Sequence, residues 1–234
     1  MFESLKNAMG FGSNPKVDTS LKSGNLQGPG TASPSTKASE WASTQGFGFS
    51  QRTDGRGGFQ MDGKIGDKPW RMEQGKPSRD FIKNCELRAR AELGLSDGVA
   101  VMVLNRQLKN ELDKRAFALY TDSLQTMADP HLPEEMRWLS IYDEVGWESL
   151  GKPFLNNYAI LAEDRETAMA WIRPELVNLL MAWPDDNPAN PQILMILRGK
   201  AYLRMQHVEG DMPTVEHATT VFTTACELAL SSLK

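Results

Sequence analysis

Cysteine is scarce in this sequence, and long apolar runs are missing. The 234 residues include two cysteines, Cys85 and Cys226, which are too few for a disulfide framework and fit a reducing compartment. Every apolar run stops well short of the about 18 residues that a membrane-spanning helix needs. The first residues carry charges where a secretory signal would be apolar. We therefore expect no transmembrane segment and a cytoplasmic location.

Motifs for catalysis and metal binding are also missing. His207 and His217 are too far apart to match the short spacings of metal ligands. The glycine-rich pieces at 46–48 and 55–58 lack the Gly-Lys-Ser/Thr ending of a phosphate-binding loop. The sequence therefore predicts no catalytic residue, no metal, no cofactor and no enzymatic activity.

Composition and charge both change near residue 78. Residues 1–80 hold 13 of the 19 glycines and carry 11 basic and 8 acidic side chains, whereas residues 81–234 carry 15 basic and 22 acidic ones. The formal net charge of −4 argues against a histone-type polyanion binder. A Gly/Ser/Thr-rich segment with little apolar periodicity cannot offset its ordering entropy. We predict a disordered, mildly basic arm over 1–78 and an acidic domain over 79–234.

The acidic domain is predicted to be all-α, with about six to seven helices in a compact bundle. Apolar residues recur at helical spacing in most of it, and Pro133, Pro174 and Pro191 stand where helices would begin. The predicted helices span residues 78–93, 97–127, 133–141, 164–171, 174–183, 190–206 and 214–233. Residues 145–162 remain unassigned as helix, strand or loop, and residues 192–198 could equally form a buried strand.

A run of cations with interleaved aromatic residues suggests nucleic-acid binding by the arm. Flexible cations that contact phosphates, with aromatic rings that stack on bases, are typical of sequence-tolerant single-strand binding. The alternative is an ordinary solvated linker. The candidate RNA-binding residues are Arg52, Arg56, Lys64, Lys68, Trp70, Arg71, Lys76 and Arg79.

The first residues form a second candidate site. Phe2, Leu5 and Met9 would share one face of a short helix that ends at the following glycines. So short a helix is marginal in water, so residues 1–12 would fold only on a protein partner or a membrane surface. The alternative is a frayed terminus.

An arm followed by a helical body is a layout common among viral nucleocapsid, matrix and coat proteins. Because 12 methionines and 6 tryptophans can form adaptable contact surfaces, we expect a non-enzymatic virion-type structural protein. It would self-associate as a homo-oligomer and use its arm for single-stranded RNA or a neighbouring subunit, in the virion or host cytoplasm. The alternative is a monomeric adaptor or regulator that docks on a protein through its N-terminal helix, without nucleic acid.

Overall fold

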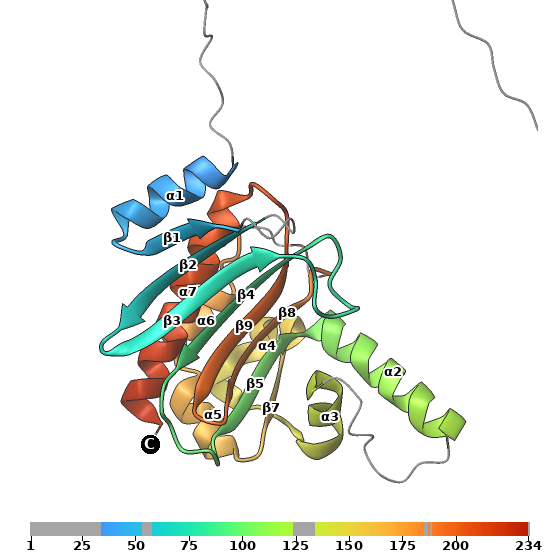
Figure 1. Cartoon of the computed structure of the whole chain (residues 1–234). Helices are drawn as coiled ribbons and strands as arrows, with labels where there is room; N and C mark the ends of the chain where they lie inside the picture. Colours follow the sequence, from blue (N-terminus) through green and yellow to red (C-terminus); the bar gives the residue numbers. More distant parts are fainter. Residues whose placement is uncertain (1–33, 53–57, 124–133, 185–186, 188, 234) are drawn as a thin grey trace, which may run out of the picture. The chain divides into compact units, whose positions relative to one another are not determined.

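The predicted all-α fold is wrong, because a nine-stranded antiparallel sheet organises the chain (Figure 1). The structure is a computed structural model, and it describes residues 34–52, 58–123, 134–184, 187 and 189–233. The strand order across the sheet is β1-β2-β3-β4-β9-β8-β5-β7-β6. Strands far apart in sequence are therefore neighbours at the centre of the sheet, where β4 pairs with β9.

Strands and helices alternate only in the second half of the described chain. The strands are β1 (Gly48–Gln51), β2 (Phe59–Ile65), β3 (Lys68–Gly75), β4 (Cys85–Glu92), β5 (Ala100–Asn105), β6 (Glu144–Val145), β7 (Tyr158–Ala162), β8 (Gln192–Leu197) and β9 (Lys200–His207). The helices are α1 (Pro34–Thr44), α2 (Arg106–Ser123), α3 (Glu134–Ile141), α4 (Gly151–Asn157), α5 (Arg165–Trp171), α6 (Pro174–Leu180) and α7 (Met212–Ser232), with a short 3₁₀ turn at Glu148–Leu150.

The predicted helix over 78–93 is wrong because its polarity alternates with a period of two. Leu87, Ala89 and Ala91 are buried on one side of β4, while Arg88 and Arg90 point to the other. A half-buried strand produces this pattern, and a helix does not. The same alternation runs along β9, which was predicted as the end of a helix over 190–206.

The central strands were missed for a different reason. Every residue of β5, β7 and β8 is buried, so these strands are apolar without alternation. Such a run cannot be distinguished from a buried helix by its periodicity. The first part of the helix predicted over 97–127 is therefore β5, and α2 begins only at Arg106. The strand alternative for 192–198 is confirmed.

Helix α1 and strands β1 to β3 lie before the predicted boundary at residue 78 and belong to the fold. Phe59 and Met61 on β2 and Met72 on β3 are buried in the core. Glycine in this part serves a turn: Gly66 joins β2 to β3 with a φ of +61°, a conformation that favours glycine. Residues 1–33 of the predicted arm lie outside the described residues.

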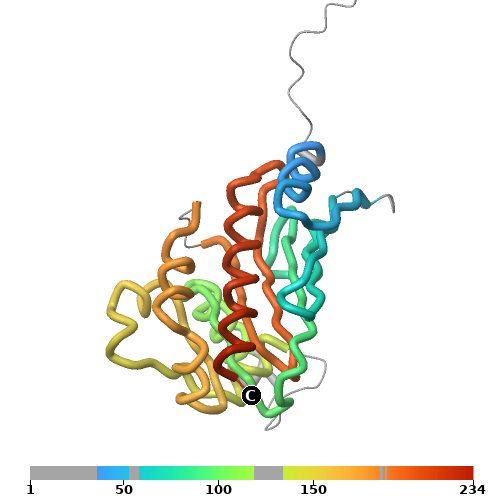
Figure 2. The backbone as a smooth tube through the Cα atoms, turned by 90° about the vertical axis from the view of Figure 1, so that its left-hand side faces the viewer, coloured from blue at the N-terminus to red at the C-terminus, as the bar shows by residue number. Residues whose placement is uncertain are grey.

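One face of the sheet is covered by α7, with α5 and α6 beside it (Figure 2). The predicted helix over 214–233 is confirmed in α7, whose Val215, Phe222 and Cys226 are buried against the sheet. The indole nitrogen of Trp171 donates a 2.9 Å hydrogen bond to the carbonyl of Ala225, which fastens α5 to α7. These contacts form the larger of two hydrophobic cores.

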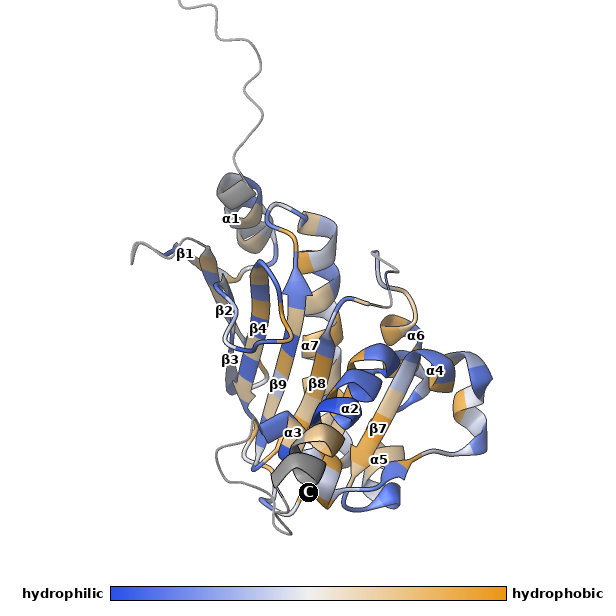
Figure 3. Cartoon of the chain, turned by 90° about the vertical axis from the view of Figure 1, so that its right-hand side faces the viewer, coloured by the Kyte–Doolittle hydropathy of each residue, from blue (hydrophilic) through white to orange (hydrophobic). Residues whose placement is uncertain are grey.

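The opposite face is covered only in part. Helices α2 and α3 pack over β8, β5 and β7, where Leu108, Met136 and Trp138 form a second core with the strands (Figure 3). On this side the strands β1 to β4 and much of β9 carry exposed or half-buried polar side chains. The sheet is therefore enclosed on both faces at one end and open on one face at the other.

Truncating a side chain on the buried face of α7 should test whether this helix covers the core. Phe222 is fully buried, so Phe222→Ala should lower the free energy of unfolding by about 3–5 kcal/mol in urea denaturation. Ile141 is 62% exposed, and Ile141→Ala should change it by less than about 0.5 kcal/mol. Equal losses for the two variants would contradict the position of α7 over the core.

Candidate functional site

Two rows of charged side chains cross the uncovered face of the sheet. In the first row, antiparallel pairing places Asp62 opposite Arg71, Arg71 opposite Arg90, and Arg90 opposite Tyr202. We name as the charged face the residues Asp62, Lys64, Arg71, Glu73, Glu86, Arg88, Arg90, Glu92, Tyr202 and Arg204, which come from β2, β3, β4 and β9.

The second row lies two residues further along each strand. Gln60 faces Glu73, Glu73 faces Arg88, and Arg88 faces Arg204. Side chains directly opposite one another in a sheet are close enough to interact, and like charges in such positions destabilise it. The charged face contains two such arginine pairs, Arg71 with Arg90 and Arg88 with Arg204. Carboxylates must therefore balance these pairs.

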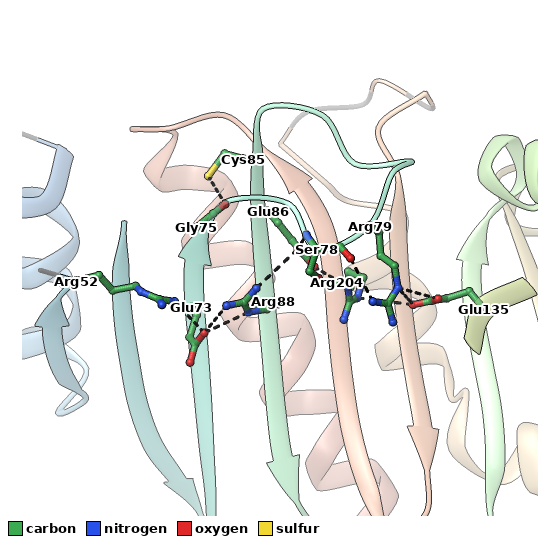
Figure 4. Close-up of polar contacts among 10 residues, drawn as sticks. All are labelled: Arg52, Glu73, Gly75, Ser78, Arg79, Cys85, Glu86, Arg88, Glu135 and Arg204. Carbon is green, nitrogen blue, oxygen red and sulfur yellow. Dashed lines mark hydrogen bonds and ion pairs between the residues drawn. The ribbon is translucent and has the colours of Figure 1, made fainter. Parts of the chain in front are cut away.

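Glu73 balances the middle of the charged face. Its Oε2 accepts hydrogen bonds from Arg88 Nη2 at 2.8 Å and from Arg52 Nη1 at 3.3 Å (Figure 4). Its Oε1 lies 3.4 Å from Arg71 Nη1. Partial burial acts to raise the pKa of Glu73, but the hydrogen bonds and charges of Arg88, Arg71 and Arg52 outweigh it and lower that pKa below its ordinary value.

Two fully buried carboxylates balance Arg204 at the border with the covered half. Arg204 Nη1 lies 3.0 Å from an oxygen of Glu86, and Arg204 Nε lies 3.8 Å from an oxygen of Glu135. Glu135 also accepts bonds from Arg79 Nε at 2.9 Å on both of its oxygens. The backbone N–H of Ser78 donates to Glu86 at 2.6 Å (Figure 4). Because Glu135 is on α3, this network ties that helix to the sheet.

The other arginine pair is presented to solvent. The side chains of Arg71 and Arg90 are 60% and 53% exposed, and Arg90 also bonds to Glu92. The guanidinium of Arg90 lies over the ring of Tyr202, 5.9 Å from its centroid, in a cation–π contact. These groups line an open groove of about 1280 Å³ that runs across β2, β3, β4 and β9.

Four of the predicted RNA-binding residues do come together here. Lys64 and Arg71 line the groove, and Arg52 and Arg79 contact carboxylates of the same network. The remaining cations lie elsewhere. Lys68 pairs with Asp67 in the turn before β3, Lys76 is exposed just after β3, and Arg56 lies outside the described residues.

Trp70 does not have the predicted position of a stacking residue. Its side chain is 2% exposed and points away from the charged face, because neighbouring residues of a strand point to opposite faces. Its ring packs edge-on against Phe47 and Phe222 in the core. Trp70 is therefore a core residue. The predicted partner-binding residues Phe2, Leu5 and Met9 lie outside the described residues.

Sequence reasoning missed most of the charged face, since only Lys64 and Arg71 of its residues were among the predicted site residues. Arg88, Arg90 and Arg204 lie on strands that were predicted as helices, and Glu135, which supports Arg204 from α3, was not among the predicted site residues. The period-two alternation of charged and apolar residues over 85–92 and 200–207 is the signal that could have placed them on one face.

Within the described parts of the chain, no helix is both long and apolar enough to cross a membrane. The same residues include no group of three or more His, Cys, Asp or Glu side chains placed to hold a metal ion.

No protein family and no curated protein matches this sequence. Among solved structures, a similar one is the crystal structure of the mycobacterial trehalose monomycolate transport factor A, TtfA, which is 9% identical. Its TM-score is 0.48, and the match covers 84% of this chain and 94% of that chain. So distant a likeness carries no argument about function. The predicted all-α classification is wrong, since a nine-stranded sheet organises the described chain, and the viral classification loses the helical body on which it was based.

Removing the carboxylate of Glu73 should change how stability depends on pH. The folded pKa of Glu73 is lowered, so its charge stabilises the fold above its ordinary pKa, and this contribution is lost as pH falls through the folded pKa. Glu73→Gln should lower the free energy of unfolding near neutral pH by about 1–2 kcal/mol. The free energy of unfolding of this variant should also decrease less on acidification than that of the unaltered chain. Urea unfolding at a series of acidic pH values measures both effects.

Glu92→Gln is the matched control for this measurement. Its carboxylate pairs with Arg90 on the same face but is 49% exposed, so the loss should be below about 0.5 kcal/mol. If the free energy of unfolding of Glu73→Gln fell on acidification as steeply as that of the unaltered chain, Glu73 would not balance the arginines.

Proposed function

We propose that this chain is a non-catalytic binding protein that takes an acidic segment of a partner protein on the charged face of its sheet. The observation that carries the proposal is the solvent-exposed pair Arg71 and Arg90, directly opposite each other on adjacent strands. The proposal keeps the adaptor role of the sequence analysis but moves the docking site from the N-terminal segment to the sheet.

Like charges held face to face favour an incoming anion. A carboxylate between Arg71 and Arg90 would relieve their repulsion, and each guanidinium can bind it through two parallel hydrogen bonds. The net charge of the whole chain adds selectivity. The chain carries 30 acidic residues against 26 basic ones, so much of its surface repels an anionic partner. A local cationic groove on an acidic protein steers an anionic partner to one place.

The chemistry of the groove favours a protein segment over RNA. Asp62, Glu73 and Glu92 are interleaved with the arginines, and they would repel the regularly spaced phosphates of a nucleic acid. Trp70 is buried, and the two other rings that line the groove, Phe47 and Tyr202, are half-buried, with Tyr202 beside Arg90. Bases would find little to stack on. Mixed charges that complement a partner are typical of specific protein interfaces.

A labelled peptide binding assay tests the proposal. The probe is a fluorescein-labelled peptide of alternating Glu and Val, and its fluorescence anisotropy is measured against the full chain. We expect binding that weakens as salt is added. Arg71→Glu/Arg90→Glu should weaken it at least about tenfold, because both cations that receive the carboxylates are reversed.

Lys114→Glu/Lys152→Glu is the matched control, since it makes the same charge change at exposed positions on α2 and α4. It should leave peptide binding within about twofold of the unaltered chain. If both double variants lost peptide affinity equally, the loss would come from net charge alone. This result would contradict a binding site on the sheet. Tighter binding of a labelled single-stranded oligouridylate than of the peptide would overturn the choice of partner.

Self-association and a cytoplasmic location stay predictions. Light scattering at several protein concentrations checks the first, because an assembling chain grows with concentration and an adaptor does not.

A further inference from the structure

A second, smaller site lies at one end of the central strands. It is a cavity of about 130 Å³ where the end of β5, the starts of β7 and β8 and the end of β9 meet α6 and the first turn of α7. The sequence did not predict this cavity, which shares no lining residue with the groove on the charged face. Its lining includes Asn105, Tyr158, Trp183, Gln192, His207 and Asp211.

Two buried side chains of this lining carry polar atoms that have no hydrogen-bond partner among the described residues. His207 is 3% exposed, and neither ring nitrogen has a hydrogen-bond partner among the described residues. Gln192 is 8% exposed; its Oε1 accepts a 3.2 Å bond from the hydroxyl of Tyr158, while its Nε2 has no partner in the same set. A buried polar group without a partner has lost its hydrogen bonds to water and gained none in return, which destabilises the fold. A molecule that bonds to both groups would remove this destabilisation.

The lining excludes an anion. Burial lowers the pKa of His207, although the charge of Asp211 opposes this, so the imidazole is neutral at neutral pH. The carboxylate of Asp211 accepts bonds from the Thr214 backbone N–H at 3.3 Å and hydroxyl at 2.6 Å, and its charge repels other anions.

The free groups also define what the ligand must offer. Gln192 Nε2 is a donor and needs an acceptor such as a carbonyl oxygen. A neutral imidazole has one donor and one acceptor nitrogen, so it can bind a group that carries both. A carbonyl next to an N–H meets these needs in a single flat molecule. A cation would leave Gln192 Nε2 unsatisfied, because an amide N–H₂ group carries only donor hydrogens.

The size and walls of the cavity favour a ring. An engineered protein cavity of about 150 Å³ holds benzene, so a cavity of about 130 Å³ accepts a six-membered ring. Tyr158, Leu180, Trp183 and Met205 provide apolar and aromatic surface around it. Tyr158 is fixed by its hydroxyl, whose one hydrogen is shared between the carbonyl of Leu180 at 2.6 Å and Oε1 of Gln192 at 3.2 Å, so this wall is already ordered.

We propose that this cavity binds a neutral six-membered ring with a carbonyl next to an N–H, of the cyclic amide or pyrimidine-base type, between Gln192 Nε2 and the imidazole of His207. The bond that Gln192 makes with Tyr158 holds its amide in the orientation that presents Nε2 to the carbonyl. The imidazole of His207 bonds to the neighbouring N–H. No covalent step is involved.

Uracil is the probe for this site. The full chain, labelled with ¹⁵N, is titrated with uracil, and the ring nitrogens of histidine are followed by NMR. The signals of His207 are those that disappear in His207→Phe, and we expect uracil to shift them. By calorimetry, His207→Phe and Gln192→Met should each bind uracil at least about tenfold more weakly than the unaltered chain.

Two further titrations sharpen the test, with thermal unfolding confirming that each variant is folded. We expect no shift of the His207 signals with benzoate, an anionic compound with a six-membered ring. We also expect none with 1,3-dimethyluracil, which lacks the N–H. Unchanged signals in uracil would mean that water fills the cavity, and this would overturn the proposal. Equal uracil affinity in His207→Phe and the unaltered chain would also overturn it, as would binding of benzoate as tight as that of uracil.

Discussion

The contact of Arg204 with two fully buried carboxylates links the two halves of this fold. Charges are costly to bury, and the network is tolerable because Arg204 forms ion pairs with Glu86 and Glu135. Glu86 also accepts a hydrogen bond from the backbone of Ser78, and Glu135 accepts hydrogen bonds from Arg79. Glu135 is on α3, Glu86 on β4 and Arg204 on β9. The network therefore fixes where the second helical layer ends and where the open face of the sheet begins.

Exposure of the arginines increases away from this border. The side chain of Arg204 is 18% exposed, that of Arg88 is 33% exposed, and those of Arg90 and Arg71 are 53% and 60% exposed. The inner arginines are held by carboxylates in a fixed geometry, whereas the outer ones reach into the groove. A rigid inner layer that supports exposed charged groups is the arrangement that precise binding requires.

Local periodicity predicts some elements here and fails for others, for definite reasons. Helix α7 and the start of α6 at Pro174 were predictable, because each carries an apolar stripe or a proline at its first position. Strands β5 and β8 are buried on both faces, so their sequences carry no alternation to recognise. The candidate site was predictable only in part. Cations over 52–79 form a cluster in sequence, but Arg204 joins them only through pairing between distant strands.

The register of β9 determines both proposed sites. Neighbouring residues of a strand face opposite ways, so Arg204 lies on the charged face while His207, three residues later, faces the cavity side. Pairing with β4 fixes this arrangement, since Arg88 is opposite Arg204 and Cys85 is opposite His207. A slip of one residue would turn the guanidinium into the core and the imidazole out to solvent. Buried Leu203 and Met205 oppose such a slip, because it would expose them. The apolar half of β9 therefore holds in place the polar residues on which both sites depend.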